Sequence, residues 1–178
     1  VKATVISNIS LAELDRYDCI FVPASSYDKS DFFRNFKAYV EQGGGGVVFE
    51  GALCGHSRFY PETPFPEIVK NAPERIDHFS REAVWKDGIA VKTMYVDFFS
   101  PVPGKKGEVI AKTPKGIPVA VQGSAGLGKV IFNGSNSIEG VNNSYNVGET
   151  KLFGMNARLA KYAIEYFTGI QLKEKNGK

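Results

Sequence analysis

The sequence predicts an α/β fold whose first half forms a parallel central sheet and whose second half is rich in antiparallel strands. Two observations lead to this prediction. In the first fifty residues, strand-length apolar runs alternate with helical patterns over short connections, which is the arrangement that builds parallel sheets with right-handed crossovers. Between residues 83 and 132, β-like segments instead follow one another, separated by Gly, Pro and Lys.

The chain begins with a strand pattern, a short helix pattern and a second strand pattern. Val1–Ile6 alternates in the manner of a short strand, and Ser10 with Glu13 forms a capping-box pattern that predicts a short helix. Cys19–Val22 is an unbroken apolar run closed by Pro23. Such a run is typical of a central strand that is covered on both faces.

A second helix and a third strand follow. From Asp28 or Ser30 onward, aromatic and aliphatic residues recur at helical spacing until Gly43–Gly46 ends the pattern. We interpret these glycines as helix-stop and turn residues, with Val47–Glu50 as the next strand. They do not form a phosphate loop, because they precede a strand instead of following one and opening a helix.

The second half predicts a shaped loop, several short strands and a closing helix. The proline-rich stretch 58–73 reads as a loop that wraps an edge of the sheet, with at most one helical turn at Ile68–Val69. Strands are expected at 83–85, 89–96, 108–112, 117–121 and 129–132, with 124–128 as the hairpin loop between the last two. An amphipathic helix is then predicted from Thr150 to Gly169.

The amino-acid composition limits the classes of function that this chain could have. The 178 residues, 43% of them hydrophobic, are enough for one well-cored domain over residues 1–178. The charge is nearly balanced, with 22 Lys+Arg against 19 Asp+Glu, so no nucleic-acid partner is expected. The apolar stretches are too short to span a bilayer, so we expect no membrane partner.

Two cysteines cannot form a disulfide framework, and the sequence indicates no compartment. Because the chain begins at Val1, we expect it to be a module of a larger protein.

Two groups of motifs resemble a known superfamily. Tyr17–Pro23, the helix that ends in Tyr39–Gly45, and Val47–Phe49 resemble a run in class I glutamine amidotransferase-like domains. Gly116–Val121 and Gly126–Gly134 resemble the ending of the trimerisation domains of some β-galactosidases and of ThuA-like domains. The resemblance implies a flavodoxin-like three-layer α/β sandwich.

The sequence departs from this superfamily at the catalytic positions. The resemblance implies a cysteine on the elbow after the Gly-rich strand, activated by a late His-Glu pair. Here Glu50 stands at that elbow, and a carboxylate cannot form a thioester. The histidines are His56 and His78, and the stretch 135–145 holds Glu139 but no His. We therefore expect a domain that is not an enzyme by itself.

A shifted elbow is the alternative interpretation. Cys54 could act as a nucleophile if a tight turn at Gly55 brought His56 back to it, with Glu50 or His56 serving the thiol. This arrangement would make the chain a cysteine-dependent amidase or hydrolase. The competing interpretation is structural, with Cys54 packed in the fold and His56 in a loop. No metal site is expected, since only one closely spaced ligand pair is present, and no cofactor is expected.

Ligand-binding candidates lie where parallel strands end. Glu50 terminates an apolar strand at the carboxyl edge, where ligands bind in open α/β sheets, although it could equally cap nearby N–H groups. The polar connection 133–146 contains Glu139, Asn142 and Tyr145 and could hydrogen-bond a sugar or another small molecule. The function predicted is a non-catalytic module for assembly or ligand binding, whose partners are other domains or copies of the same protein. The resemblance places it within carbohydrate metabolism by association.

Overall fold

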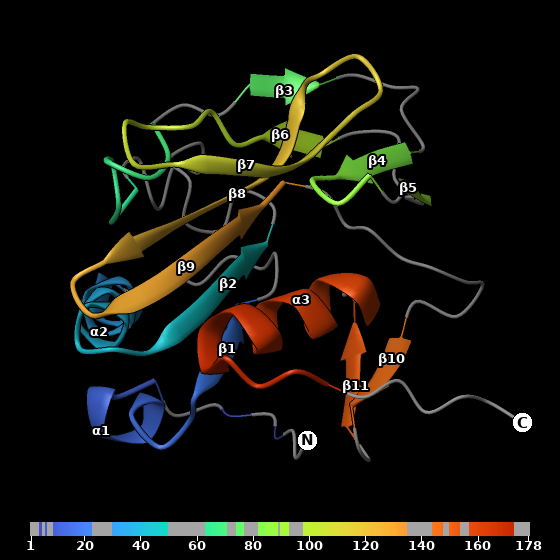
Figure 1. The fold of residues 1–178 in the computed structure, drawn as a ribbon. Helices are drawn as coiled ribbons and strands as arrows, with labels where there is room; N and C mark the ends of the chain where they lie inside the picture. The colour runs from blue at the N-terminus through green and yellow to red at the C-terminus, as the bar shows by residue number, and fades with distance from the viewer. Residues whose placement is uncertain are drawn as a thin grey trace, which may run out of the picture.

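The described part of the chain forms a mixed sheet with helices on both of its faces (Figure 1). The computed structural model describes residues 4, 6, 9–22, 30–49, 63–70, 74–76, 82–88, 90–92, 98–134, 144–147, 150–153 and 157–172. Of the predicted first strand, Val1–Ile6, all but Thr4 and Ile6 fall outside these residues.

The main sheet has seven strands in the order β1-β2-β9-β8-β7-β4-β5. Its parallel part consists of β1 (Cys19–Val22), β2 (Gly45–Phe49) and β9 (Gly128–Asn133). Its antiparallel part continues from β9 through β8 (Pro118–Ala125), β7 (Glu108–Lys112), β4 (Glu82–Trp85) and β5 (Ala90–Lys92). The sequence prediction of a parallel core with an antiparallel extension is confirmed.

The two faces of the sheet carry separate cores, which makes three layers. One face is covered by α1 (Leu11–Leu14), α2 (Ser30–Glu41) and the turn around Ile68, and the other is covered by α3 (Ala157–Thr168). Consecutive residues of β9 divide between the cores, since Phe132 packs with α2 and Ile131 packs with α3. This alternation is the two-residue period of a strand that is buried on both faces. The fold is a flavodoxin-like α/β sandwich.

The short helix α1 begins as its capping residues predict. The side chain of Ser10 accepts a hydrogen bond from the N–H of Glu13 at 3.4 Å. The Glu13 carboxylate accepts bonds from Arg16 at 2.8 Å and Tyr17 at 3.0 Å. The hydrogen bond to Arg16 is the main reason that the pKa of Glu13 is lowered.

The glycine run after α2 ends the helix and also leaves room for aromatic side chains to pack. The strand β2 begins at Gly45, so two of the four glycines belong to the strand, which corrects our interpretation of them as turn residues. A Cβ atom at Gly44 would collide with the ring of Tyr39, and one at Gly46 would collide with Phe36. At Gly45 the colliding ring would be Phe167 of α3. The run therefore lets aromatic side chains approach both faces of β2.

The turn at the tip of the β8–β9 hairpin docks on the end of α2. Gly126 has a φ of +59°, and the N–H of Leu127 donates to the carbonyl of Glu41 at 2.9 Å. A Cβ at Gly126 would meet the Glu41 backbone, so glycine is required both by conformation and by space. This contact satisfies a carbonyl group at the helix end.

The segment before α3 is a strand pair and not the start of the helix. β10 (Ser144–Val147) pairs antiparallel with β11 (Thr150–Phe153). The predicted helix start at Thr150 is therefore wrong, because four-residue apolar patterns fit a strand as well as a helical turn. A further pair, β3 (Glu74–Ile76) with β6 (Phe98–Ser100), was not predicted.

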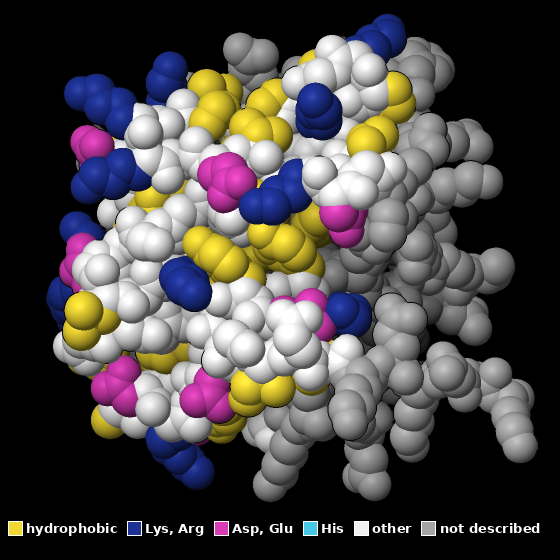
Figure 2. Space-filling model, in the orientation of Figure 1, with side chains coloured by type: hydrophobic (Ala, Val, Ile, Leu, Met, Phe, Trp, Pro, Cys, Tyr) yellow, Lys and Arg dark blue, Asp and Glu magenta, His cyan; other side chains and the backbone are white. Residues whose placement is uncertain are grey.

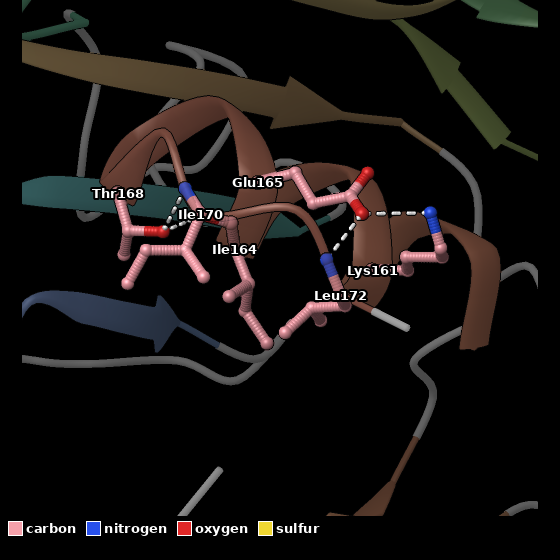
Figure 3. A network of polar contacts seen from close by, with 6 residues as sticks. All are labelled: Lys161, Ile164, Glu165, Thr168, Ile170 and Leu172. Atoms are coloured by element: carbon pink, nitrogen blue, oxygen red, sulfur yellow. Dashed lines mark hydrogen bonds and ion pairs between the residues drawn. The ribbon is translucent and has the colours of Figure 1, made fainter. Parts of the chain in front are cut away.

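The chain reverses direction after α3 through a network of polar contacts (Figure 3). Gly169 has a φ of +71°, and the hydroxyl of Thr168 accepts the N–H of Ile170 at 3.1 Å. The Glu165 carboxylate accepts hydrogen bonds from Lys161 at 2.7 Å and from the N–H of Leu172 at 2.8 Å. These contacts hold the residues that follow the helix against its last turns, as the predicted end at Gly169 requires.

Candidate functional site

The carboxyl ends of the three parallel strands lie at one edge of the sheet. Val22 pairs with Val48, and Phe49 pairs with Asn133, so β1, β2 and β9 end at nearly the same level. Ligands of open α/β sheets bind outside this edge. The sequence places Glu50 directly after Phe49, and the predicted polar connection directly after β9.

Asn133 is a buried polar residue at this edge that the sequence did not single out. It is the last residue of β9, and only 3% of its surface is exposed. The next residue, Gly134, donates its N–H to the carbonyl of Val119 at 2.9 Å, which fixes the end of the strand. The sequence did contain a signal for this residue, because the amide Asn133 directly follows the apolar run Val130–Phe132. Our prediction placed Asn133 in the loop.

The other predicted site residues are distributed as follows. Glu50, Cys54, His56, Glu139 and Asn142 lie outside the residues that the structure describes. Tyr145 belongs to β10, where its backbone pairs with Leu152. The predicted loop 133–146 is therefore wrong at its end, since β10 begins at Ser144.

The described thiol, Cys19, is not an activated nucleophile. It is the first residue of β1, and so it lies at the amino end of the parallel strands, opposite the edge where ligands bind. Burial raises the pKa of the Cys19 thiol far above its usual range, and the nearby Asp18 carboxylate raises it further. A thiol that stays protonated at neutral pH neither attacks carbonyl groups nor binds metals readily.

A polar network crosses the antiparallel half of the sheet. The Tyr162 hydroxyl of α3 donates to Oε1 of Gln122 at 2.7 Å, and Nε2 of Gln122 donates to Glu108 at 2.6 Å. Lys86 then donates to the other oxygen of Glu108 at 2.9 Å. The hydrogen bond from Lys86 is the first cause of the lowered pKa of Glu108, and Gln122 adds to it. Burial raises the pKa of Tyr162.

Aromatic rings extend this network into a column beside α3. Trp85 and Tyr162 have ring centroids 5.5 Å apart, and Tyr162 stacks on Tyr166 at 6.0 Å with 17° between the planes. The Lys129 ammonium lies 4.6 Å from the centroid of Tyr166 and donates to the carbonyl of the same residue at 2.7 Å. Because each polar group already has a partner, the column serves to fasten α3 to the sheet.

A shallow depression lies at the opposite, amino edge of the parallel strands. Its volume is about 30 Å³, and it is lined by Gly43–Gly45, Leu127–Lys129 and Phe167. The ammonium group of Lys129 is engaged with Tyr166, and the N–H of Lys129 donates to the Gly44 carbonyl at 3.2 Å. The glycines here supply close packing, in agreement with our rejection of a phosphate loop.

The described residues contain neither a cluster of metal-ligating side chains nor a membrane-spanning helix. Within them, no three His, Cys, Asp or Glu side chains come together in a way that could hold a metal ion. None of the helices in the described ranges is both long enough and apolar enough to cross a membrane.

Solved structures of known proteins share the fold. The cytoplasmic protein STM3548 from Salmonella typhimurium matches with a TM-score of 0.53 and 18% identity, over 76% of this chain and 67% of that chain. Gan42B, a GH42 β-galactosidase from G. stearothermophilus, matches with a TM-score of 0.54 and 14% identity, over 68% of this chain. A ThuA-like protein from Bacteroides uniformis has a TM-score of 0.50 and 13% identity, over 71% of this chain and 63% of that chain.

These similarities show that the chain shares its α/β fold with these proteins. The match covers 19% of the β-galactosidase chain, so it concerns one part of that larger protein. No family model matches this sequence, and no curated protein does. At such low identities the shared fold does not carry activity from one protein to another.

Proposed function

We propose that the chain is a non-catalytic amidotransferase-like module that serves assembly or ligand binding within a carbohydrate-processing protein. The observation that carries the proposal is the end of β2. The strand ends at Phe49, level with Asn133 of β9, and the residue that follows in the sequence is Glu50. In the sequence, an acidic residue therefore occupies the position at which the resemblance implies a nucleophilic thiol, so the edge suits hydrogen bonding better than acyl transfer.

The carbohydrate part of the proposal comes from the comparisons. Gan42B is a β-galactosidase, and a ThuA-like protein shares the fold. A module matching one fifth of a glycosidase chain fits an accessory role, since the fold similarity does not extend to the rest of that enzyme. Glu50, which follows β2 in the sequence, offers a carboxylate of the kind that hydrogen-bonds sugar hydroxyls, and Asn133 ends the neighbouring strand at the same edge.

Thiol reactivity tests the non-catalytic part. The chain is treated with iodoacetamide at neutral pH, and the labelling of Cys19 and of Cys54 is followed by peptide mass spectrometry. A non-catalytic module requires Cys54 to react no faster than a free thiol of ordinary pKa, and Cys54→Ala to fold normally. The proposal is overturned if Cys54 is labelled many times faster and if Cys54→Ala abolishes a hydrolase activity that Cys19→Ala retains.

Ligand binding at the carboxyl edge is tested with neutral sugars. Thermal unfolding of the chain is recorded with increasing galactose, lactose and galacto-oligosaccharides. Specific binding raises the midpoint with ligand concentration, and the rise is lost in Glu50→Gln or Asn133→Ala. The variant Glu41→Gln, at the exposed end of α2, is the matched control. A rise that persists in both edge variants would place the binding elsewhere.

A further inference from the structure

A chemically labile pair of residues lies at the carboxyl edge of the sheet. Asn133 is followed by Gly134. An Asn-Gly pair is prone to lose ammonia from its side chain, because glycine has no Cβ to hinder the approach of its nitrogen to the side-chain carbonyl carbon. In water the resulting ring opens to aspartate or to isoaspartate. A second pair, Asn176–Gly177, lies outside the described residues.

The structure holds both residues of this pair in an arrangement that cannot react. Asn133 is the last residue of β9 and pairs with Phe49 of β2 on one side and with Ala120 of β8 on the other. The nitrogen of Gly134 is the attacking atom, and its N–H donates to the carbonyl of Val119 at 2.9 Å. Ring closure requires the backbone at Asn133 to leave the extended conformation and requires the Gly134 nitrogen to lose its proton. The paired strand therefore prevents both steps.

The fold also limits the access of water to this pair. Asn133 is 3% exposed, and Gly134 is buried. Figure 1 shows β9 in the interior of the sheet, between β2 and β8. In Figure 2, drawn from the same side, hydrophobic and charged side chains cover the middle of the molecule. The reaction at Asn133 therefore depends on the fraction of molecules in which the end of β9 is open.

Opening at this end of β9 requires only a small part of the sheet to separate. The hydrogen bond from Gly134 to Val119 extends the ladder between β8 and β9 by one step beyond Asn133. Local opening at the end of an element costs less free energy than global unfolding. Because such opening is fast compared with the loss of ammonia, the rate at Asn133 equals the rate of the open chain multiplied by the open fraction.

We propose that Asn133 is a deamidation site that local opening of the end of β9 activates. In the open state, hydroxide removes the proton of the Gly134 nitrogen, which then forms a bond to Cγ of Asn133. The bond from Cγ to the side-chain nitrogen breaks, and that nitrogen takes up a proton and leaves as ammonia. Water adds to one of the two ring carbonyl groups and opens the ring. The net reaction exchanges ammonia for water, without oxidation or reduction.

The product of this reaction does not fit the closed edge. A carboxylate at position 133 would lie in a site that is 3% exposed, and burying a charge costs more free energy than burying an amide. Isoaspartate also lengthens the main chain by one carbon atom, which disturbs the pairing with Phe49 and Ala120. The modification is therefore a one-way ageing reaction that leaves the edge less stable. It needs only water, so it does not depend on the proposed function.

The first test compares the folded chain with a peptide. Deamidation at Asn133 is followed by peptide mass spectrometry in the full chain and in a synthetic peptide of residues 130–137, in the same buffer at pH 8. The folded chain is expected to react about tenfold more slowly or slower still, and tenfold corresponds to an opening free energy of about 1.4 kcal/mol. Hydrogen exchange at the Gly134 amide measures the opening independently. A folded chain that reacts as fast as the peptide, or that is slowed by less than its exchange protection, overturns the proposal.

Two matched variants separate local opening from global unfolding. Val119→Ala removes buried contacts beside the hydrogen bond of Gly134, and Val130→Ala removes buried contacts nearer the other end of β9. Val119→Ala is expected to speed deamidation by about tenfold, while Val130→Ala lowers the global stability and leaves the rate nearly unchanged. Acceleration of both variants in proportion to their loss of global stability, or no acceleration in Val119→Ala, would contradict local opening. If Val119→Ala does not fold, the comparison with hydrogen exchange in the wild type decides.

Discussion

The Tyr39 hydroxyl accepts a hydrogen bond from the backbone N–H of Gly45 at 3.2 Å. The same hydroxyl donates to the carbonyl of Tyr17 at 2.9 Å. One side chain of α2 thus connects the segment before β1 with the first residue of β2. Tyr39 is 2% exposed, and burial raises the pKa of its hydroxyl well above the usual range, so the group stays protonated and keeps donating.

Removing this hydroxyl should destabilise the fold. Tyr39→Phe is expected to lower the free energy of unfolding by about 1–2 kcal/mol, because the buried N–H of Gly45 loses this acceptor and the half-buried carbonyl of Tyr17 loses this donor. Urea unfolding measures the change. Tyr17→Phe is the matched control, because its hydroxyl bonds the Glu13 carboxylate at 3.0 Å near the surface. Equal losses in the two variants would show that the position of Tyr39 between the strands has no special effect.

Replacing a glycine of the run Gly43–Gly46 should destabilise the fold through steric contact and not only through backbone strain. Gly46→Ala is expected to cost about 1–3 kcal/mol, because the added methyl group meets the ring of Phe36. Gly116→Ala is the comparison, since it has a φ of +86° and open space around it. Gly46→Ala should lower the free energy of unfolding less in a Phe36→Leu background than in the wild type. Strict additivity in chemical denaturation would contradict the proposed contact.

The charge pair between Lys86 and Glu108 should contribute stability that depends on pH. Because the pKa of Glu108 is lowered from 4.5, its contribution is present above that value and is lost as the pH falls through the lowered pKa. Both side chains are about half exposed, so solvent limits the coupling to roughly 0.5 kcal/mol. A double-mutant cycle with Lys86→Met and Glu108→Gln should show this coupling at pH 7. Persistence of the coupling at pH 2.5 would refute the assignment.

The polar contacts after α3 should protect one amide from exchange. Glu165→Gln is expected to speed hydrogen exchange at the Leu172 amide, because a neutral amide is a weaker acceptor and loses the ion pair with Lys161 (Figure 3). In the wild type, acidification should likewise reduce the protection of this amide, relative to its intrinsic exchange rate at each pH, once the pH falls through the lowered pKa of Glu165. Thr168→Val should instead affect Ile170, whose N–H the Thr168 hydroxyl accepts. Unchanged exchange at Leu172 in both conditions would remove the role assigned to Glu165.

Elements with strong local signals could be predicted from the sequence. The capping residue Ser10, the apolar run Cys19–Val22 and the helical spacing before Gly43 each specify their element through neighbours in the chain. The strand at Glu108–Lys112 was predicted with the bounds that the structure shows. In these segments local preference and tertiary environment agree.

The remaining errors come from contacts between distant residues. Phe167 lies far from Gly45 in the sequence, so nothing near the glycines indicates why a side chain is excluded there. Thr150–Phe153 is too short for its period to decide between helix and strand, and pairing with Ser144–Val147 decides it. Of the candidate site, the sequence predicted the edge of the sheet but not the burial of Asn133 in it.

The pairing of β9 with β2 also constrains the order of events during synthesis. Gly45 pairs with Lys129, so the central ladder joins a strand made early to one made late. While a ribosome is still producing the intervening residues, β1 covers one edge of β2, but the other edge has no strand to pair with because β9 has not yet been made. The newly made N-terminal half must therefore avoid aggregating through this unpaired edge until the β8–β9 hairpin has been synthesised and β9 pairs with β2.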